Sequence, residues 1–236
     1  KLDNYTRAYI IGKLKFKKNS KISFEQLKKG ILNLNATQNF SAINYSFDKM
    51  QEGEKLILNL KENSTSTFLK FGLHYDDLYK SGVLINFTKK KLLVKNDVAS
   101  LDVVLGDNIR YNFDYYIDNG FYWSYGFNSK LVSFNKNVST DFGSGDLFGV
   151  LGINSVNVDF LDVSNQVYFQ TIFAQKISIG TGLEYKHLKI KSQTIENTEP
   201  VFDNSGYLSV FGYAKYDSFD QKYFPRKGWG MNSELK

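Results

Sequence analysis

The chain has 236 residues, of which 16% are aromatic and only 2 are Pro, a composition that favours pleated β-sheet and argues against a helix bundle. Its net charge of +6 comes mostly from Lys, whereas proteins that read nucleic acids rely on Arg, so we expect no nucleic-acid partner. It has no Cys and no apolar run near the ~18 residues of a spanning helix, which excludes disulfides, cysteine chemistry and helical membrane proteins.

The beginning of the chain combines a strand pattern with a helix pattern. Residues 5–16 alternate well enough around Tyr9 to predict a strand. Ser23 and Gln26 then form a capping-box pair, which marks the start of a helix. The apolar residues that follow keep helical spacing: Phe24, Leu27, Ile31 and Leu34.

Two alternating runs follow a connection at residues 36–40, which we interpret as a short helix or a turn. The runs are Ile43–Phe47 and Leu56–Glu62, and Gly53 lies in the turn between them, so they predict a hairpin. Residues 1–63 therefore predict a small α+β domain with the order β-α-α-β-β.

From Thr67 onward the pattern changes to long alternating segments without a helix signal. We count about nine strands of roughly 8–14 residues, longer than the ~5–6 residues of soluble sheets and close to the ~9–11 that cross a bilayer. Their centres lie at residues 69–75, 83–87, 101–105, 111–117, 121–127, 166–174, 177–190, 207–216 and 228–235.

The two faces of these strands distinguish a membrane barrel from a soluble sandwich. One face is rich in Phe, Tyr and Leu, and the other carries Gly, Asn, Asp, Ser and His. Small, mildly polar residues suit a wet lumen, and aromatic residues at strand ends suit the membrane interfaces. An antiparallel transmembrane β-barrel is therefore favoured, with a soluble β-rich adhesin as the minor alternative.

The lengths of the connections predict which end of the barrel faces the periplasm. The two longest connections, residues 135–163 and 191–205, are both odd-numbered. Outer-membrane barrels keep short turns in the periplasm and long loops outside. The even-numbered connections, together with the N-terminal domain, are therefore predicted to be periplasmic: residues 91–97, 118–120, 174–176 and 219–227.

An α+β unit that runs directly into long aromatic strands resembles the outer-membrane assembly and two-partner-secretion superfamily, in which a polypeptide-transport-associated domain precedes a surface-antigen barrel. Four segments resemble the C-terminal half of patatin-like phospholipases: Phe71–Asp76, Leu105–Tyr111, Gly182–Leu188 and Asp220–Gly228. The last segment is the most specific, because Phe-Pro-x-x-Gly recurs at a periplasmic turn of that superfamily. It supplies the site residues that we assign, a structural turn motif of Asp220, Phe224, Pro225 and Gly228.

The resemblance implies a periplasmic domain at residues 1–63 and the N-terminal part of an outer-membrane β-barrel at residues 67–236. Family barrels have about sixteen strands, and bacterial single-chain barrels have even strand numbers. The Arg-Gly-Phe/Tyr lid motif of the family is missing. We therefore expect the parent protein to continue for roughly seven more strands.

The sequence offers no catalytic, cofactor-binding or metal-ligating residues. It has no Gly-x-Ser-x-Gly elbow, and Gly143–Asp146 imitates one without the strand–Ser–helix setting. His74 and His187 are far apart in sequence and fall on polar strand faces, which predicts hydrogen bonding in the lumen. The basic run Lys13–Lys21 offers a contact for anionic lipid headgroups or lipopolysaccharide, with a solvated turn as the plainer interpretation.

The resemblance implies a barrel that anchors, with export as a further role, an upstream patatin-type phospholipase domain. The alternative is a barrel that inserts outer-membrane proteins or serves as a two-partner secretion pore, whose α+β domain receives unfolded clients by strand addition. The chain alone is expected to hydrolyse nothing, and a parent of the first kind would be a serine lipid hydrolase. The expected partners are outer-membrane lipids, lipopolysaccharide, protein clients or the upstream domain, and further copies of the chain.

Overall fold

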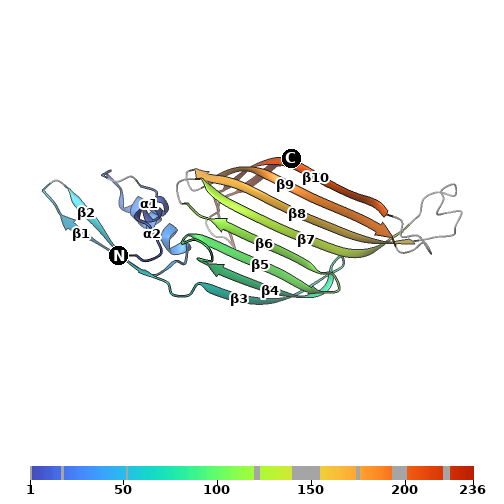
Figure 1. Ribbon diagram of the computed structural model, residues 1–236. Helices are drawn as coiled ribbons and strands as arrows, with labels where there is room; N and C mark the ends of the chain where they lie inside the picture. The colour runs from blue at the N-terminus through green and yellow to red at the C-terminus, as the bar shows by residue number, and fades with distance from the viewer. Residues whose placement is uncertain are drawn as a thin grey trace.

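The computed structural model describes residues 2–16, 19–51, 53–119, 123–139, 155–173, 176–192, 201–219 and 224–236. A small N-terminal unit lies at one end of a long curved sheet (Figure 1). The N-terminal unit comprises α1 (Arg7–Leu14), α2 (Phe24–Ala36), β1 (Phe40–Lys49) and β2 (Glu54–Glu62). The curved sheet comprises β3 (Thr67–Asp76), β4 (Lys80–Lys90), β5 (Asp97–Gly106), β6 (Arg110–Ile117), β7 (Ser124–Ser139), β8 (Ser155–Phe173), β9 (Ile177–Ser192), β10 (Val201–Asp217) and β11 (Gly230–Leu235).

The chain begins with a helix, α1, so the strand predicted over residues 5–16 is wrong. The hydroxyl of Thr6 accepts a hydrogen bond from the Tyr9 N–H and caps the helix. The buried side chains recur four or five residues apart, as on one face of a helix: Tyr5, Tyr9, Ile10 and Leu14. The N-terminal unit therefore has the order α-α-β-β instead of β-α-α-β-β.

The second helix, α2, begins at the predicted capping box. The Gln26 N–H donates to Ser23 Oγ at 3.2 Å, and the Ser23 N–H donates to Gln26 Oε1 at 2.8 Å. Both helices contribute to one hydrophobic core with the start of β1: Tyr5, Tyr9, Ile10, Leu14, Leu34 and Phe40. Neither helix in the described part of the chain is long and apolar enough to cross a membrane.

Strands β1 and β2 form the predicted hairpin. Tyr45 pairs with Leu58 and Phe47 with Leu56, and the turn contains Gly53 with φ of +87°, a left-handed conformation that favours glycine. Within the described residues the hairpin pairs with no other strand. Its two outer edges therefore present main-chain donors and acceptors without strand partners.

The curved sheet contains nine strands in chain order, β3 to β11, and all neighbouring pairs are antiparallel. The nine strands predicted after Thr67 are therefore confirmed. Strands β3 and β11 lie at the two edges, and the described strands do not close into a barrel.

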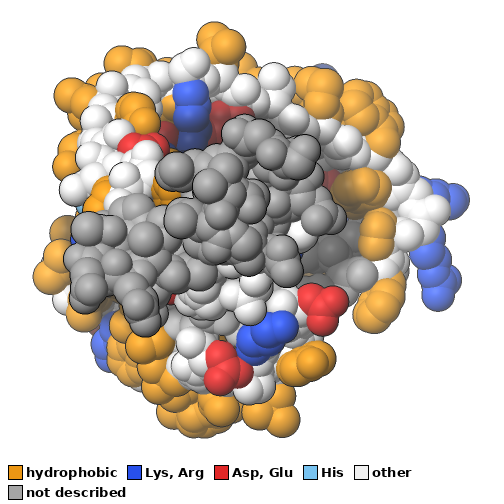
Figure 2. Space-filling model, turned by 90° about the vertical axis from the view of Figure 1, so that its right-hand side faces the viewer, with side chains coloured by type: hydrophobic (Ala, Val, Ile, Leu, Met, Phe, Trp, Pro, Cys, Tyr) orange, Lys and Arg blue, Asp and Glu red, His pale blue; other side chains and the backbone are white. Residues whose placement is uncertain are grey.

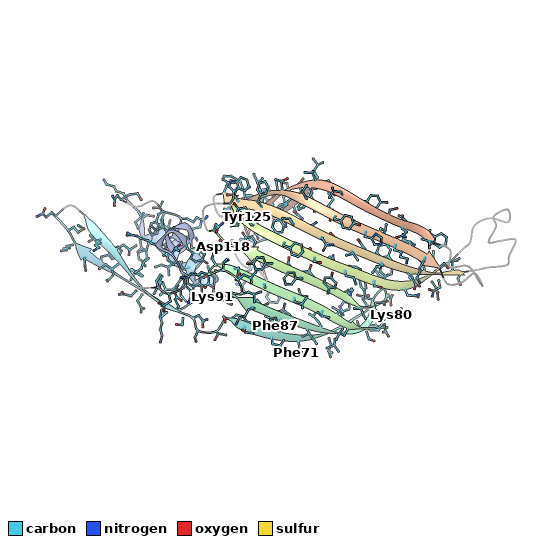
Figure 3. All side chains as sticks on the ribbon, viewed as in Figure 1. Phe71, Lys80, Phe87, Lys91, Asp118 and Tyr125 are labelled. Carbon is cyan, nitrogen blue, oxygen red and sulfur yellow. The ribbon has the colours of Figure 1, made fainter. Side chains whose placement is uncertain are left out.

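We call the exposed side of this sheet the outer face. Phe71 pairs with Ile85, and Ile85 pairs with Val103, so the predicted apolar face continues across strands. Leu73 is 90% exposed and Phe71 is 70% exposed, and Figure 3 labels Phe71 and Phe87 on these strands. Figure 2, viewed from the end away from the N-terminal unit, shows hydrophobic side chains gathered around the outside.

The opposite side, the inner face, carries polar residues that hydrogen-bond across strands. Asn86 Nδ2 donates to Asp102 Oδ1 at 2.6 Å. Glu184, which is 3% exposed, accepts from Ser164 Oγ at 2.8 Å and lies 2.8 Å from the ammonium of Lys236. The polar residues predicted for a lumen are therefore largely paired with one another.

Two inner-face tyrosines pack directly against glycines of the neighbouring strand. A Cβ at Gly126 would lie 2.1 Å from the Tyr168 ring, and a Cβ at Gly180 would lie 2.4 Å from the Tyr213 ring. The two rings meet edge to face, with centroids 6.4 Å apart. Glycine at these positions lets the tyrosine rings approach the backbone of the wall.

Strands β7 to β10 are longer than predicted. The loops expected at residues 135–163 and 191–205 are therefore too long, because their first and last residues belong to the flanking strands. Asn157 Nδ2 donates to Asn135 Oδ1 at 2.8 Å and to Asn137 Oδ1 at 2.9 Å. These cross-strand hydrogen bonds maintain pairing where the apolar alternation stops. The Gly143–Asp146 stretch lies outside the described residues.

Candidate functional site

The N-terminal unit meets the curved sheet at the β4–β5 and β6–β7 turns, and we call these contacts the junction. Lys13 of α1 forms an ion pair with Asp118 of the β6–β7 turn, and their side chains are 19% and 23% exposed. Lys95 Nζ of the β4–β5 turn donates to the Asp3 carbonyl oxygen at 2.8 Å. Figure 3 labels Asp118 and Lys91 at this end of the sheet.

Glu62, the last residue of β2, connects three segments at the junction. Its carboxylate accepts hydrogen bonds from the Asn4 N–H at 2.9 Å and from Asn4 Nδ2 at 2.5 Å. Lys91 Nζ lies 3.9 Å from the same carboxylate. Burial alone would raise the pKa of Glu62, but the Asn4 hydrogen bonds and the Lys91 charge outweigh it and hold the pKa below its ordinary value.

Two tyrosines form the aromatic part of the junction. The Lys91 ammonium lies 5.0 Å from the centroid of the Tyr5 ring, a cation–π contact. The Tyr9 hydroxyl accepts a hydrogen bond from Asn39 Nδ2 at 2.9 Å. Burial, assisted by the charge of Glu62, raises the pKa of Tyr5 to about 12.

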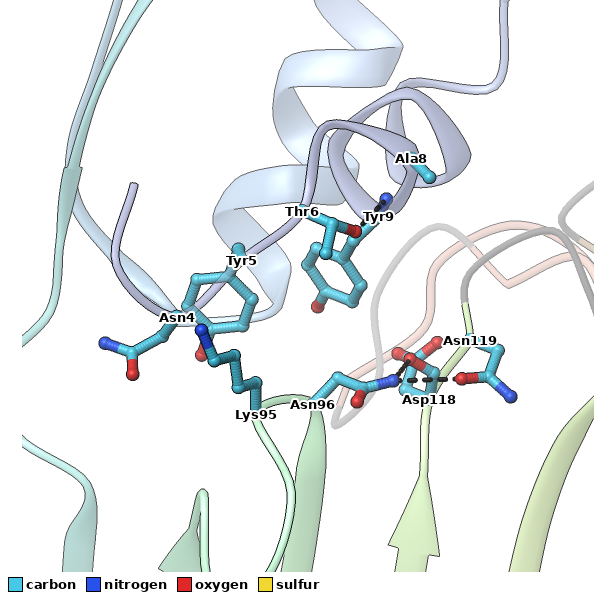
Figure 4. A pocket seen from close by; sticks show the side chains of 9 residues that line it. All are labelled: Asn4, Tyr5, Thr6, Ala8, Tyr9, Lys95, Asn96, Asp118 and Asn119. Atoms are coloured by element: carbon cyan, nitrogen blue, oxygen red, sulfur yellow. Dashed lines mark hydrogen bonds between the residues drawn. The ribbon is translucent and has the colours of Figure 1, made fainter. Parts of the chain in front are cut away.

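A cavity of about 420 Å³ lies between the start of α1 and the two turns (Figure 4). Thr6 and Tyr9 line it on the helix side. On the sheet side, Asn96 Nδ2 donates to the Asp118 carbonyl oxygen at 2.5 Å and to Asn119 Oδ1 at 3.0 Å. Hydroxyl and amide groups of this kind can hydrogen-bond a peptide main chain. In the part of the chain that the structure describes, no group of three His, Asp or Glu residues could hold a metal ion.

The predicted turn motif follows β10, at the same end of the sheet as the junction. Asp220 lies outside the described residues, and the Phe224 side chain is 82% exposed. Gly228 has φ of +103°, and a Cβ there would lie 2.3 Å from the Ser218 carbonyl oxygen. The glycine of the motif is thus required by the turn itself.

The remaining sequence candidates lie apart from the junction, with one exception. His74 Nε2 lies 2.5 Å from Asp76 Oδ2 on the inner face, as the polar pattern predicts. His187 pairs with Val163 and shares a face with the half-exposed Tyr185, so its predicted inner position is wrong. The exception is Lys13, the first residue of the basic run, whose ammonium binds Asp118.

Sequence reasoning missed the junction residues because their contacts join distant parts of the chain. Lys13 and Asp118 are separated by 105 residues, and neither lies in a recognisable motif. A weak signal was available in the placement of polar residues at even-numbered turns. Those turns are predicted to lie on the same side of the membrane as the N-terminal domain, and the contacts of Lys95 and Asp118 place two of them next to that domain.

Comparison with known proteins gives one family and a fold likeness. The sequence profile of the OMP85 superfamily matches residues 54–236, a range that begins in β2 and includes the whole curved sheet. No curated protein matches the chain.

Two solved structures resemble the chain. BamA from Haemophilus ducreyi, in a crystal structure lacking POTRA domains 1–3, has a TM-score of 0.59 at 13% identity. The match covers 98% of this chain and 45% of BamA. CdiB from Acinetobacter baumannii has a TM-score of 0.52 at 14% identity, covering 96% of this chain and 44% of CdiB. The chain therefore spans less than half of either structure, and at this identity the likeness concerns the fold alone.

Proposed function

Because the chain belongs to the OMP85 superfamily of outer-membrane β-barrel proteins, we propose that it contributes the N-terminal unit and part of the wall of a barrel that inserts or secretes other polypeptides. The observation that carries this proposal is the β1–β2 hairpin. Its outer edges are unpaired among the described strands, and such an edge can accept an extended client segment by strand addition.

The junction supports the same proposal, because it connects the hairpin to the sheet. Glu62 ends β2 and faces Lys91, while Lys13 binds Asp118. A client strand added to the hairpin is thereby held beside the end of the curved sheet. The inner face then offers paired polar groups, along which a polar main chain can move without burial in an apolar surface.

We assign residues 1–63 to a periplasmic domain and residues 67–236 to the barrel. In this orientation the junction and the turn motif of Phe224, Pro225 and Gly228 face the periplasm, and the β3–β4 turn faces outward. The longest connection of the sheet, residues 140–154 between β7 and β8, then lies on the outward side, where outer-membrane barrels carry their long loops, and this supports the orientation.

The test is reconstitution of the intact protein in phospholipid vesicles with an unfolded outer-membrane barrel protein as client. We expect faster client folding than in empty vesicles. Folding is measured as the band of folded client, whose migration on gels changes when the sample is heated. Residues 1–236 contain no Cys, so Ser46→Cys in β1 introduces the one thiol within this part of the protein and serves as the cross-linking position. A client with one Cys should cross-link at Ser46→Cys and not at Lys28→Cys, an exposed position on α2. Equal folding with and without the protein, with no β1 cross-link, contradicts the proposal.

A second candidate is the anchor of an upstream patatin-type lipid hydrolase, with lipids as its substrate. It is favoured by the four sequence segments that resemble such proteins, among them Asp220–Gly228. The distinguishing measurement is ester hydrolysis by the intact protein and by residues 1–236 alone. Hydrolysis by the intact protein only supports the anchor, and its absence from both leaves the polypeptide-handling barrel.

A further inference from the structure

A second cavity, of about 190 Å³, lies on the inner face, between the β3–β4 turn and strands β5 to β7. Arg110 of β6 and Lys130 of β7 supply two positive charges to its lining, and Asp102 of β5 supplies one negative charge. Val104 and Val132 add apolar surface. The cavity is therefore a small recess with a net positive charge, away from the junction.

Aromatic packing fixes the position of Arg110 in this recess. Its guanidinium carbon lies 3.7 Å from the centroid of the Tyr79 ring. Tyr79 meets the Phe134 ring edge to face at 5.9 Å, and Phe134 stacks on Phe160 at 4.6 Å. The guanidinium is thus held by a row of three rings that extends from the β3–β4 turn to β8, so little ordering is needed when it binds a ligand.

Arg110 and Lys130 have no anionic partner among the described residues. Neither forms an ion pair there, and Arg110 Nε is buried without a hydrogen-bond partner. Asp102, the carboxylate in the recess, already accepts a hydrogen bond from Asn86. Lys186, another inner-face cation, is paired, since its ammonium lies 3.0 Å from Asp162 Oδ2. A positively charged side chain that is held in place and has no ion-pair partner is available to bind an anionic ligand.

We propose that Arg110 and Lys130 form a carboxylate-binding site that takes an acidic side chain of a polypeptide segment lying along the inner face. The recess, of about 190 Å³, has room for a side chain and lies on the inner face, along which an extended chain can run. A guanidinium fork matches a carboxylate with two parallel hydrogen bonds, and Lys130 adds charge. The inference rests on the proposed function, because that function supplies the polypeptide.

The test uses two extended peptides that differ only in a central Glu or Gln, added to the intact protein in detergent micelles. Fluorescence anisotropy should give at least about tenfold tighter binding for the Glu peptide, as expected for a charge-assisted bidentate pair. Arg110→Gln should abolish this difference, and Lys130→Gln should reduce it. Arg110→Lys should keep part of it, because the charge remains without the fork.

Lys215→Gln is the matched control, because Lys215 is another inner-face cation held against an aromatic ring, 4.8 Å from the centroid of Tyr213. It should leave the preference for Glu unchanged. Heat-modifiable migration checks that each variant is folded, and the Glu/Gln comparison on the unaltered protein needs no variant.

Three results overturn the site: equal binding of both peptides, a preference that survives Arg110→Gln, or an equal loss in Lys215→Gln. Inorganic phosphate that displaces the peptide at lower concentration than free glutamate does would assign the recess to a free anion and overturn the polypeptide assignment. Client folding in vesicles is measured separately. If clients fold but the peptides bind equally, the carboxylate site fails and the proposed function stands.

Discussion

At the scale of single residues, the fold requires a negative charge at Glu62 and the absence of a side chain at Gly182. Glu62 contributes through charge, because its carboxylate holds Asn4 and Lys91 together at the junction. Gly182 contributes through the lack of a side chain, because β9 passes close to β8 at this position. A change of charge at the first and of volume at the second therefore has separate, measurable effects.

The lowered pKa of Glu62 predicts a pH dependence of the junction. The ionised carboxylate stabilises the folded state, so its contribution is complete above about pH 4.5, the ordinary value of a glutamate, and is lost as pH falls through the lower folded value. Glu62→Gln removes the titrating group. Hydrogen exchange of α1 amides should therefore be slower in the unaltered protein near neutral pH, and the two proteins should converge as the pH falls through the lowered pKa of the folded state. A difference that is constant with pH counts against this role.

Gly182→Ala should destabilise the sheet. A Cβ there would lie 2.2 Å from the Val167 carbonyl oxygen and 2.8 Å from the Tyr168 Cβ, so the backbone of β8 has to move. We expect a loss of about 1–3 kcal/mol in the free energy of unfolding, measured by urea titration in detergent micelles. Gly212→Ala is the control, since its Cβ would have its nearest neighbour at 3.9 Å. Equal effects of the two substitutions would refute the steric argument.

At the scale of elements, α1 contacts the curved sheet through Lys13. Its cap at Thr6 and its buried residues orient Lys13, in the last turn, toward Asp118. The side of α1 that carries Tyr9 packs on the N-terminal core and also lines the junction cavity. One short helix therefore completes the core of the N-terminal unit and attaches that unit to the β6–β7 turn.

A double-mutant cycle on Lys13→Ala and Asp118→Ala should measure this attachment. The pair is partly buried, so we expect a coupling free energy of about 0.5–1 kcal/mol, read from hydrogen exchange of α1 amides. Asp107, in the β5–β6 turn at the opposite end of the sheet, provides the control. The cycle of Lys13→Ala with Asp107→Ala should be additive, and coupling of similar size in both cycles would show that the contact is not specific.

Elements with a local signal could be predicted from the sequence, and those held by distant contacts could not. Phe71 and its alternating neighbours predict a strand, and Ser23 with Gln26 predicts a helix start, because each pattern lies within a few residues. The pattern of residues 5–16 predicts a strand where the structure has a helix, because a helix of eight residues has too few turns to display its period. The junction and the recess depend on pairs such as Lys13 with Asp118, whose proximity only the folded chain creates.

At the scale of the whole molecule, the sheet has two chemically different ends. The junction end carries the N-terminal unit and the β4–β5 and β6–β7 turns, and the other end carries the β3–β4 turn and the extended ends of strands β7 to β10 (Figure 1). The proposed orientation places the junction end in the periplasm. This orientation decides on which side of the outer membrane each turn lies, and labelling of intact cells can test it.

The absence of cysteine makes this orientation directly testable. Asp77→Cys introduces a thiol in the β3–β4 turn, and Leu93→Cys introduces one in the β4–β5 turn, where Leu93 is 76% exposed. A bulky polyethylene-glycol maleimide should label Asp77→Cys in intact cells and Leu93→Cys only after the outer membrane has been permeabilised. The reverse pattern would place the N-terminal unit outside the cell.

The unequal strand lengths give the wall an oblique rim. β6 has 8 residues and β8 has 19, so at a rise of ~3.3 Å per residue they span roughly 26 Å and roughly 63 Å. In the proposed orientation the longer strands protrude above the lipid surface on one side of the wall, and Asn135 and Asn157 lie on the protruding part. A large molecule outside the cell could therefore reach the upper ends of β7 to β10, whereas the low side would lie closer to the lipid surface.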